Sequence, residues 1–570
     1  MPYAGAEAPA SYKACNKFPT RDTSDAVVPR PSVHAIHVLL SCVSAIMSAS
    51  EPVTDPSPPQ KRSSPFASGV AIVLYVALVR IVLYLIAAPN YGYFRDELYY
   101  LACGEHPAWG YVDQPPMIAW VAWLLQHTIG TSLYALRLLP AIAHAGTIVL
   151  AGLLTRELGG RRWAMFLAAL AALLSPVALA FGHLFTMNAF DPLLWTAIAF
   201  FVARIATRGD ERLWLGVGAL FGITLLNKYG VAFWVVGLAI GVVLTPLRQN
   251  LRHSWLWIGG ALGAAIALPN FLWQWRHGFP FLELMHNVRA QGRDIVLAPP
   301  AFLKAQAEMI GYASGLLVLF ALIFFFFAPA GRLFRALGWA YLIFLAEMMA
   351  LHGKMYYLGP VYPILFAAGA VWLESATAGK AWIWAKPAVA VAIASISGIY
   401  APMILPILPV DSFLAYEHRM GIEQQKFEHQ KEGRLPQLYA DMFGWEQIAQ
   451  RVAAYYHTLS PEDQAKTAIF ANNYGDAAAI DFFGPRYGLP KAIGNHQSYW
   501  LWGPRQYTGE SLIVLGEGHE RNMQTKCTSY SIVGTTEYPL SRPDEWKPIY
   551  HCRGLKPGLQ QMWPLNKHWD

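Results

Sequence analysis

Long apolar segments follow one another along most of the 570-residue chain, and they constrain its fold more than any other feature. A helix needs about 20 apolar residues to cross a bilayer. Eleven segments approach or exceed this length, the shortest being 213–227 and 337–352. They span 66–88, 133–155, 163–182, 187–206, 213–227, 229–246, 254–273, 307–329, 337–352, 356–375 and 387–409. The pattern predicts an all-α polytopic membrane protein with eleven transmembrane helices.

The composition supports a membrane protein. Charged residues make up 14% of the chain and hydrophobic residues 55%, whereas a soluble protein carries about 25% charged residues. Aromatic residues, at 14%, suit a chain with two membrane interfaces. The net charge of +7 comes from short Lys and Arg clusters between apolar segments, not from a basic face. A soluble enzyme, a disordered chain and a nucleic-acid-binding protein are therefore excluded.

Basic residues occur in every second connection between the apolar segments, and cytoplasmic loops are the ones enriched in Lys and Arg. With the N-terminus in the cytoplasm, the cytoplasmic connections hold Arg156, Arg161, Arg162, Arg204, Arg208, Arg212, Arg248, Arg252, Arg332, Arg335, Lys380 and Lys386. We therefore expect a cytoplasmic N-terminus and an extracytoplasmic C-terminal part. Because eukaryote-like loops and targeting signals are absent from the sequence, we expect the bacterial inner membrane.

Three regions are expected along the chain. Residues 1–65, rich in Pro, Ser, Ala and charge, predict a disordered cytoplasmic segment, and Met47 is an alternative start. Residues 66–410 predict the transmembrane module, with an outer loop at 89–132. Residues 411–570 predict a small extracytoplasmic α/β domain.

Two features of the C-terminal region support this expectation. Short β-like runs at Thr467–Ala471 and Ser511–Leu515 lie between Gly, Pro and Asn turns. Cys527 and Cys552 could form a disulfide if this region lies outside the cytoplasm.

The first outer loop holds the most informative residues. Asp96 and Glu97 are adjacent acids directly after the first apolar segment, and Asp113 precedes Pro115 and Pro116. The sequence around them predicts two interfacial helices that carry carboxylates at the membrane surface. Three acids beside a Pro-Pro break and many aromatic residues favour a functional surface over a loop whose acids merely pair with Arg95.

These motifs resemble those of glycosyltransferase family 39. The family has an Asp-Glu pair after the first span, followed by an acid-X-Pro-Pro motif. Further similarity lies in Thr186–Pro192, Asn227–Gly230 and His352–Pro360, so that the resemblance covers residues 66–375. The tail motifs Asn473–Ala478 and Tyr499–Pro504 are similar to the outer domain of some bacterial members. The family includes protein O-mannosyltransferases and the lipid A aminoarabinose transferase, and it belongs to the GT-C class. The resemblance thus implies a GT-C fold and a sugar donor linked to polyprenyl phosphate.

The resemblance also implies that Asp96 is the catalytic carboxylate. An inverting transferase needs a base that takes the proton of the acceptor hydroxyl as its oxygen attacks the anomeric carbon. Glu97 would orient Asp96 or the acceptor. Alternatively, Glu97 pairs with a Lys or Arg.

Asp113 matches a position where lipid A-modifying relatives have Glu before Lys-Pro-Pro, and that acid can hold a metal. Gln114 stands here in place of the Lys, which removes one positive charge near the carrier phosphate. Asp113 and His352 are the candidates for holding a divalent metal or the acceptor, although a lone His more often satisfies local hydrogen bonds. No other cofactor is implied.

The departing polyprenyl phosphate carries negative charge that must be neutralised. Lys354 is the best candidate, because it opens an apolar segment and precedes Tyr356 and Tyr357. Lys228 and Arg276 are further candidates on the same outer side. Alternatively, Lys354 and the two tyrosines only anchor a span at the interface.

Arg80 lies inside the first apolar segment, where an unpaired charge costs about 3 kcal/mol. Asp191 and Glu347 are acids within other apolar segments. We therefore expect an internal ion pair between Arg80 and one of these acids.

The leading prediction is a membrane glycosyltransferase that moves a hexose or pentose from a polyprenyl-phosphate donor to an outer-face acceptor, which could be a glycan, a lipid or a protein. The competing class is a transporter or flippase of a lipid-linked sugar, which would place its ionisable residues near the bilayer midplane. A third class is a membrane scaffold whose tail binds a partner.

Overall fold

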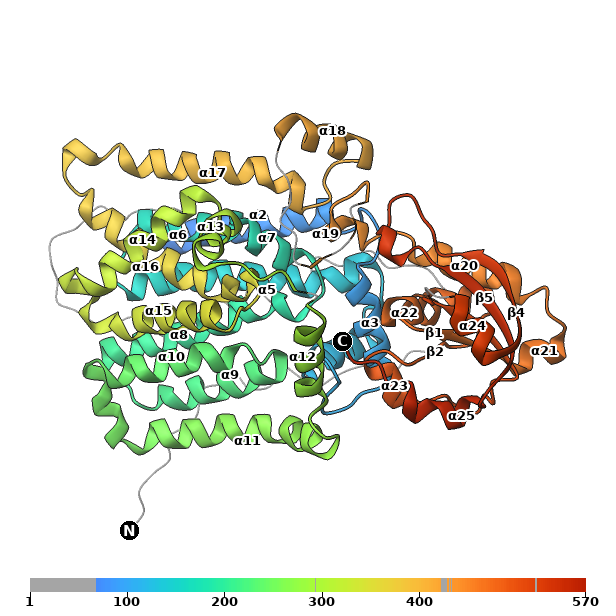
Figure 1. The fold of residues 1–570 in the computed structure, drawn as a ribbon. Coiled ribbons are helices and arrows are strands. Elements are labelled where there is room, and N and C mark those ends of the chain that lie inside the picture. Colours follow the sequence, from blue (N-terminus) through green and yellow to red (C-terminus); the bar gives the residue numbers. More distant parts are fainter. Residues whose placement is uncertain (1–67, 293, 422–427, 430, 432, 518–519) are drawn as a thin grey trace, which may run out of the picture. The chain divides into compact units, whose positions relative to one another are not determined.

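The computed structural model describes residues 68–292, 294–421, 428–429, 431, 433–517 and 520–570 (Figure 1). The described residues lie in one compact unit, Ser64–Asp570. The expectations for residues 1–65, including a start at Met47, lie outside the described residues.

Seven helices of the described chain are long and apolar enough to cross a membrane. They are α2 (Gly69–Ala87), α5 (Leu133–Glu157), α8 (Asp191–Arg208), α11 (Ser254–Arg276), α15 (Arg335–Ala350), α16 (Tyr362–Ala376) and α17 (Ala385–Ile404). The 3₁₀ turns η2 (Met187–Ala189), η4 (Pro329–Phe334) and η5 (Met355–Val361) precede and extend three of these spans, those of α8, α15 and α16.

Three further helix pairs form bent spans. They are α6 (Arg162–Leu174) with α7 (Pro176–His183), α10 (Val231–Val243) with η3 (Pro246–Arg252), and α13 (Pro299–Ile310) with α14 (Tyr312–Phe326), bent by 62°, 98° and 111°. The described residues thus provide up to ten spans, besides the shorter apolar helix α9 (Leu213–Asn227). All eleven predicted apolar segments are helical, which confirms the predicted fold class.

The local sequence explains two of the bends. Ser175 precedes Pro176 and has ψ 133°, because the residue before a proline is disfavoured in the helical conformation. Gly311 separates α13 from α14 with φ +77°, a left-handed value that glycine adopts without strain.

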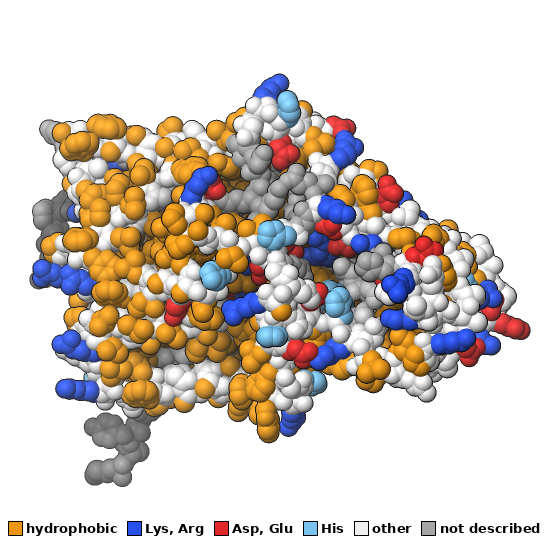
Figure 2. Space-filling model, in the orientation of Figure 1, with side chains coloured by type: hydrophobic (Ala, Val, Ile, Leu, Met, Phe, Trp, Pro, Cys, Tyr) orange, Lys and Arg blue, Asp and Glu red, His pale blue; other side chains and the backbone are white. Residues whose placement is uncertain are grey.

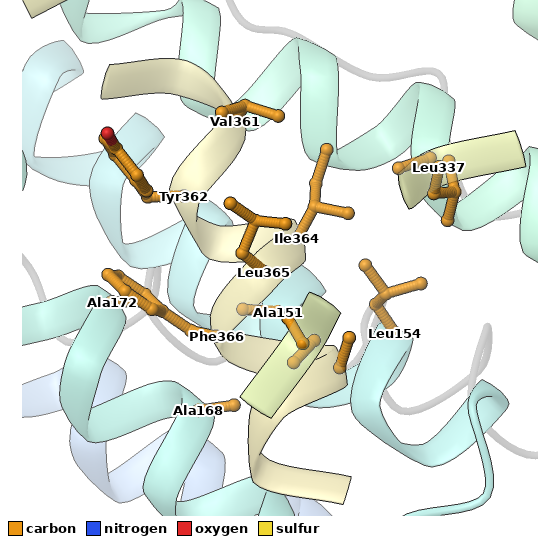
Figure 3. Close-up of a cluster of buried hydrophobic side chains, with 14 of the residues drawn as sticks. Ala151, Leu154, Ala168, Ala172, Leu337, Val361, Tyr362, Ile364, Leu365 and Phe366 are labelled. Carbon is orange, nitrogen blue, oxygen red and sulfur yellow. The ribbon is translucent and has the colours of Figure 1, made fainter. Parts of the chain in front are cut away.

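The centre of the helical region is α16, which is buried along almost its whole length. Figure 3 shows Ile364, Leu365 and Phe366 of α16 among side chains of α5, α6 and α15. Gly369 allows α14 to approach closely, because a Cβ there would lie 1.9 Å from the carbonyl oxygen of Leu317.

Glycines also bring α9 and α11 together. A Cβ at Gly218 would lie 1.8 Å from the carbonyl oxygen of Gly259, and a Cβ at Gly222 would lie 2.6 Å from that of Gly263. Both helices thus present two glycines four residues apart, which is the spacing that lets membrane helices pack backbone to backbone.

The exterior of the helical region is apolar. Figure 2 shows hydrophobic side chains over this region, while charged side chains gather at its ends and over the C-terminal region. Helix α2 alone exposes Leu74, Leu78, Val82 and Leu85. Apolar patches of this extent are rare on soluble monomers, so this surface faces lipid and the chain is a multi-pass membrane protein.

Short helices lie outside the spans. The first outer loop contains α3 (Arg95–Glu105) and α4 (Met117–His127), the two helices predicted there. The later connections form α12 (Pro280–Gln291), α18 (Val410–Met420) and η6 (Lys380–Trp382). Helix α3 packs against α4 on one side and against α22 (Tyr474–Phe483) of the C-terminal region on another.

The C-terminal region contains a five-stranded sheet with the order β2-β1-β3-β5-β4. Its strands are β1 (Thr467–Ala471), β2 (Ile493–Gly494), β3 (Ser511–Leu515), β4 (Cys527–Thr535) and β5 (Pro548–Leu555). Strand β1 pairs in parallel with β2 and β3, whereas β5 is antiparallel to β3 and β4. The two β-like runs predicted from the sequence are β1 and β3, and Cys527 and Cys552 form a disulfide between β4 and β5.

Helices cover both faces of this sheet. The helices of the C-terminal region are α19 (Gln437–Ala440), α20 (Trp445–Tyr456), α21 (Pro461–Lys466), α22, α23 (Ser498–Trp502), α24 (Glu520–Lys526) and α25 (Leu559–Met562), with η7 (Gly484–Tyr487), η8 (Pro543–Glu545) and η9 (Trp563–Leu565). Of these, α19 packs on Met403 and Phe413 and not on the sheet. Ile469 and Ile513 on one face share a buried cluster with side chains of α3, α20 and α22. Phe470, Leu512 and Val514 on the other face pack in a second cluster with residues of α24, α25 and η9.

Candidate active site

Helix α3 begins next to the two adjacent acids. The backbone N–H of Phe94 donates to Oε2 of Glu97 at 2.9 Å, which caps the first turn. Asp96 and Glu97 both lie in this turn, where negative charge is favoured by the helix dipole. Because successive residues on a helix point about 100° apart, the two carboxylates face different surroundings.

Glu97 is fully buried. Its carboxylate accepts two hydrogen bonds from the guanidinium of Arg137 in α5, at 3.0 and 3.1 Å, and a third from the backbone N–H of Phe185 at 2.9 Å. Both side chains of the pair are 0% exposed. Glu97 is therefore the partner of an arginine, which was the alternative considered for it, and a role in orienting Asp96 or the acceptor stays a prediction.

Asp96 remains accessible, with 29% of its side chain exposed. Its Oδ1 accepts a hydrogen bond of 2.8 Å from the hydroxyl of Tyr474, at the start of α22, and lies 3.5 Å from Nε of Arg95. A residue of the C-terminal region thus holds a carboxylate of the first outer loop.

Arg95 links Asp96 to further residues of the C-terminal region. Its guanidinium lies 5.3 Å from the ring centroid of Tyr474, and its nitrogens lie 3.8 Å from Glu545 and 4.0 Å from Asp441. Burial raises the pKa of Asp441, although Arg95 and Arg542 oppose this shift. The buried network fixes the orientation of α3 against the C-terminal region.

Asp113 lies beside Asp96. Its Oδ1 accepts a hydrogen bond of 2.9 Å from the hydroxyl of Tyr99, and the Tyr99 and Tyr474 ring centroids are 4.8 Å apart. Burial raises the pKa of Asp113 to about 7, and the charge of Asp96 adds to the shift. Two carboxylates, each bound by one of two neighbouring tyrosines, therefore form the acidic part of the site.

Gln114 points away from these carboxylates. It is fully buried, and its Nε2 lies 3.5 Å from Sγ of Cys103. The residue that replaces the lysine of lipid A-modifying relatives therefore packs in the interior of the loop and provides no charge.

Lys228 lies between α9 and α10, with two tyrosines beside it. Its Nζ donates to Oδ1 of Asn188 at 2.6 Å and lies 5.2 and 4.8 Å from the ring centroids of Tyr356 and Tyr357. Burial lowers the pKa of Lys228 to about 8, although the nearby carboxylate of Asp191 opposes the shift. The ammonium and the two hydroxyl-bearing rings can bind an anion together.

The residue after Lys228 connects this group to the acids. Burial raises the pKa of Tyr229 to about 12, and the charge of Asp113 acts in the same direction. The hydroxyl of Tyr229 donates to Oδ1 of Asn270 at 2.8 Å. The Lys228–Tyr229 turn and Asp113 are therefore electrostatic neighbours.

Lys354 is already paired with acids. Its Nζ lies 2.9 Å from Oδ1 of Asp294 and 3.3 Å from Oε1 of Glu428, which come from two outer connections. Burial lowers the pKa of Lys354, but Tyr356 and the two acids outweigh it, so that the pKa is raised. A phosphate would have to compete with these carboxylates for the ammonium.

Other predicted residues lie outside this group. Asp191 accepts a hydrogen bond of 2.7 Å from Nδ2 of Asn227, the residue before Lys228, and so stabilises the turn that holds Lys228. Arg276 and His352 have exposed side chains, and the structure gives neither an interaction with the other candidates. His352 has φ +54°, so its backbone is strained.

The predicted ion pair of Arg80 is wrong. A guanidinium nitrogen of Arg80 donates to the carbonyl oxygen of Gly182, and neither Asp191 nor Glu347 is within 4.0 Å of it in the described residues. Gly182, which provides this carbonyl, lies near the end of α7 in the bent span α6–α7.

Within the described ranges, one group of three side chains has metal-ligating atoms close together, namely His496, His568 and Asp570, all within 4.8 Å. Asp570 is 3.0 Å from His496 and 3.1 Å from His568. Burial would raise the pKa of Asp570, but hydrogen bonds from both histidines outweigh it and hold that pKa well below its usual range. The backbone N–H of Tyr474 donates to Nδ1 of His496 at 3.3 Å, which leaves the proton on Nε2. The two histidines of this trio thus each lie within ion-pair distance of Asp570.

Sequence reasoning missed several of these residues. Arg137 and Asp441 carry no motif, and Arg95 was considered only as a partner for the loop acids. Tyr474 lies in the tail motif that resembles bacterial members, 378 residues from Asp96. The motif was the available signal, but its contact with Asp96 depends on the fold.

The fold combines a bundle of apolar helices with two short helices of the first loop, of which α3 carries Asp96 and Glu97, and a C-terminal sheet packed on them. The crystal structure of ArnT from Cupriavidus metallidurans bound to undecaprenyl phosphate superposes with a TM-score of 0.54 and 16% identity, over 86% of this chain and 98% of that chain. Its apo structure gives 0.53 and 15% identity, over 84% and 97%. At these identities the similarity shows that this chain shares the fold of those structures and carries no conclusion about activity.

Sequence comparison identifies more particular relatives. The family model described as dolichyl-phosphate-mannose-protein mannosyltransferase matches residues 113–273. Lipid A galacturonosyltransferase RgtD of Rhizobium johnstonii is 30% identical over 212 residues, or 37% of this chain and 44% of that protein. The chain thus spans less than half the length of this relative. Both comparisons agree with the resemblance to glycosyltransferase family 39, and the matched family segment includes Asp113 and Lys228 but not Asp96.

Proposed function

We propose that the chain is an inverting membrane glycosyltransferase that uses a polyprenyl-phosphate sugar and acts at the extracytoplasmic face. One observation carries this proposal. The loop that carries Asp96 and Asp113 is joined to the turn that holds Lys228 and Tyr229, because Asn270 donates to the carbonyl oxygen of Trp109 at 2.8 Å and accepts a hydrogen bond of 2.8 Å from Tyr229. A base and an anion-binding group therefore share one surface, as transfer from a phosphate carrier requires.

The reaction follows from these positions. The acceptor oxygen forms a bond to the anomeric carbon while the bond from that carbon to the phosphate oxygen breaks. The acceptor proton passes to Asp96, and the bonding electrons leave with the phosphate. Tyr474 and Arg95 hold Asp96 in one orientation, because a hydroxyl and a guanidinium both contact its carboxylate.

The phosphate binds Lys228, Tyr356 and Tyr357 in this proposal. The buried ammonium has lost part of its hydration, so a phosphate is a strong replacement partner. Lys354 joins this group when the phosphate displaces Asp294 or Glu428. Arg276 and His352 have no assigned role.

The donor and acceptor classes come from the relatives. One relative is named for galacturonosyl transfer to lipid A, and one solved structure holds undecaprenyl phosphate. We therefore propose a hexosyl or pentosyl group on undecaprenyl phosphate as the donor and a lipid-linked or other envelope glycan as the acceptor. The proposed location is the bacterial inner membrane, with the N-terminus in the cytoplasm.

A divalent cation is a further part of the proposal. The carboxylate of Asp113 is a hard oxygen ligand of the kind that Mg²⁺ and Mn²⁺ prefer, and this assignment keeps Asp96 as the base. A cation held by Asp113 would supply charge near the carrier phosphate in place of the lysine absent at Gln114. Chelation of the purified protein, followed by readdition of Mg²⁺ or Mn²⁺, tests this part through sugar transfer.

The deciding experiment measures transfer of radiolabelled sugar in membranes that contain wild-type chain or Asp96→Asn, with a panel of undecaprenyl-phosphate sugars and native envelope acceptors. Loss of the base should lower transfer by about 10²–10⁴-fold. Glu105→Gln is the matched control, because Glu105 lies on the same helix and pairs with Lys491 at the surface. Full activity in Asp96→Asn would refute the proposed base. Movement of the lipid-linked sugar across the bilayer in both proteins, without transfer, would instead establish the flippase.

A further inference from the structure

The C-terminal region contains a cavity of about 150 Å³ that the catalytic surface does not use. It lies on the face of the sheet formed by Phe470, Leu512 and Val514, opposite the face that packs with α3 and α22. Met523 of α24 and Trp563 of η9 form part of its walls. The floor and part of the walls are therefore apolar.

Polar side chains line the same cavity. They are Asn472, Glu517, Asn522, Lys526 and Asn566. Asn472 follows β1 directly, and Glu517 follows β3 by two residues, so both lie at the carboxyl ends of parallel strands. Ligands of open α/β sheets bind at this edge.

This lining fits a sugar ring. An apolar floor with an indole can pack against the C–H groups of a ring, while amides, a carboxylate and an ammonium pair with hydroxyl groups. Glu517 and Lys526 balance each other in charge, and Oε2 of Glu517 accepts a hydrogen bond of 3.1 Å from Asn522. The cavity thus favours a neutral ligand over a phosphate or a uronic acid.

The cavity is linked to the catalytic surface through one loop. Asn472 lines the cavity, and Tyr474, two residues later, donates to Asp96. Two residues span at most about 7 Å. A ligand in the cavity is therefore bound by the same loop that orients the proposed base.

We propose that this cavity binds a neutral sugar ring of the acceptor glycan, next to the residue that receives the transferred sugar. The proposal rests on the glycosyltransferase function for the identity of the ligand. Binding of a sugar in the cavity does not depend on the glycosyltransferase function, so either proposal can fail while the other stands.

The test uses the full chain in nanodiscs and saturation-transfer difference NMR with methyl glycosides of neutral hexoses and pentoses, and with a methyl glycoside of a uronic acid. Val514→Phe fills the cavity, and Asn522→Ala removes one polar wall. Each should weaken binding of the neutral glycoside at least tenfold. Thr525→Ala is the matched control on α24, because Thr525 does not line the cavity, and it should bind as wild type does.

Transfer assays separate the two proposals. Asp96→Asn should keep glycoside binding and lose transfer, whereas Asn522→Ala should raise the KM for the acceptor with little change in kcat. Unchanged binding in both cavity variants would overturn the inference, as would saturable binding of alkyl detergent chains but of no glycoside. Lost glycoside binding in the cavity variants, together with full transfer by Asp96→Asn, would support the sugar site in the cavity and refute the proposed base.

Discussion

Two neighbouring carboxylates of α3 serve two different regions of the molecule. Glu97 points into the helix bundle, where Arg137 of α5 encloses it without exposure to water. Asp96 points toward the C-terminal region, where Tyr474 binds it and 29% of its side chain is exposed. One acid therefore joins the loop to the membrane helices, and the other stays accessible at the C-terminal region. The difference shows that an acidic pair in a motif need not act as a pair.

The largest expected effect comes from breaking the buried pair. Glu97→Gln leaves the Arg137 guanidinium buried without a countercharge, which should lower the free energy of unfolding by about 3–5 kcal/mol. Thermal unfolding of the detergent-solubilised protein measures this loss. Asp96→Asn is the comparison, because its accessible carboxylate should cost about 1 kcal/mol or less on replacement.

A double variant sharpens the same comparison. Glu97→Leu with Arg137→Met removes both charges and should recover most of the stability lost in Glu97→Gln. If Glu97→Gln unfolds at the wild-type temperature yet abolishes transfer, Glu97 acts in catalysis and the division between the two acids is wrong.

A smaller effect concerns the dependence of stability on pH. Burial raises the pKa of Asp113 from 3.8 to about 7, so the folded chain holds this proton more tightly than the unfolded chain does. Stability from this group is present at low pH and falls as pH rises from about 4 to about 7, by about 1–3 kcal/mol. Asp113→Asn should remove this fall and leave the protein more stable than wild type at pH 8.

Thermal unfolding of both proteins between pH 4 and pH 8 measures the effect. Asp481→Asn is a useful comparison, because burial also raises the pKa of that carboxyl, to about 6, so that this variant should remove a fall in stability that is complete at a lower pH. An Asp113→Asn variant with the pH dependence of the wild type would show that Asp113 has the same pKa in the folded and the unfolded chain.

The sequence predicted the parts of the molecule that depend on local pattern. Apolar runs determine the spans, and short, continuously buried runs between turn residues determine β1 and β3, since each depends on neighbours in the chain. Asp96 was found because a motif surrounds it. The partner of Glu97 could not be predicted, because Arg137 lies 40 residues away and many arginines were equally plausible. The same is true of Tyr474 and of Lys354, whose acids come from connections that only the fold brings together.

A further prediction concerns Tyr474, the residue of the C-terminal region that donates a hydrogen bond to Asp96. Tyr474→Phe removes the hydroxyl that donates to Asp96 but keeps the ring beside Arg95 and Tyr99. A lost hydrogen bond to a charged group is worth about 1.5–3 kcal/mol, so transfer should fall by about 10–100-fold and the unfolding temperature should fall as well. Tyr507→Phe is the matched control. An equal loss in both variants would mean that Tyr474 does not position the base.

The smallest effect concerns Lys354, which is held by acids where a phosphate should bind. Asp294→Asn removes one competing carboxylate at 2.9 Å and should lower the KM for the lipid-linked donor about 2–5-fold, because partly exposed ion pairs contribute 1 kcal/mol or less. Asp411→Asn, which loosens an exposed pair with Arg434, is the control and should leave KM unchanged. A raised KM in Asp294→Asn would mean that the acid helps to bind the donor, for example through a sugar hydroxyl. Lys354 would then orient that acid and would not bind the phosphate.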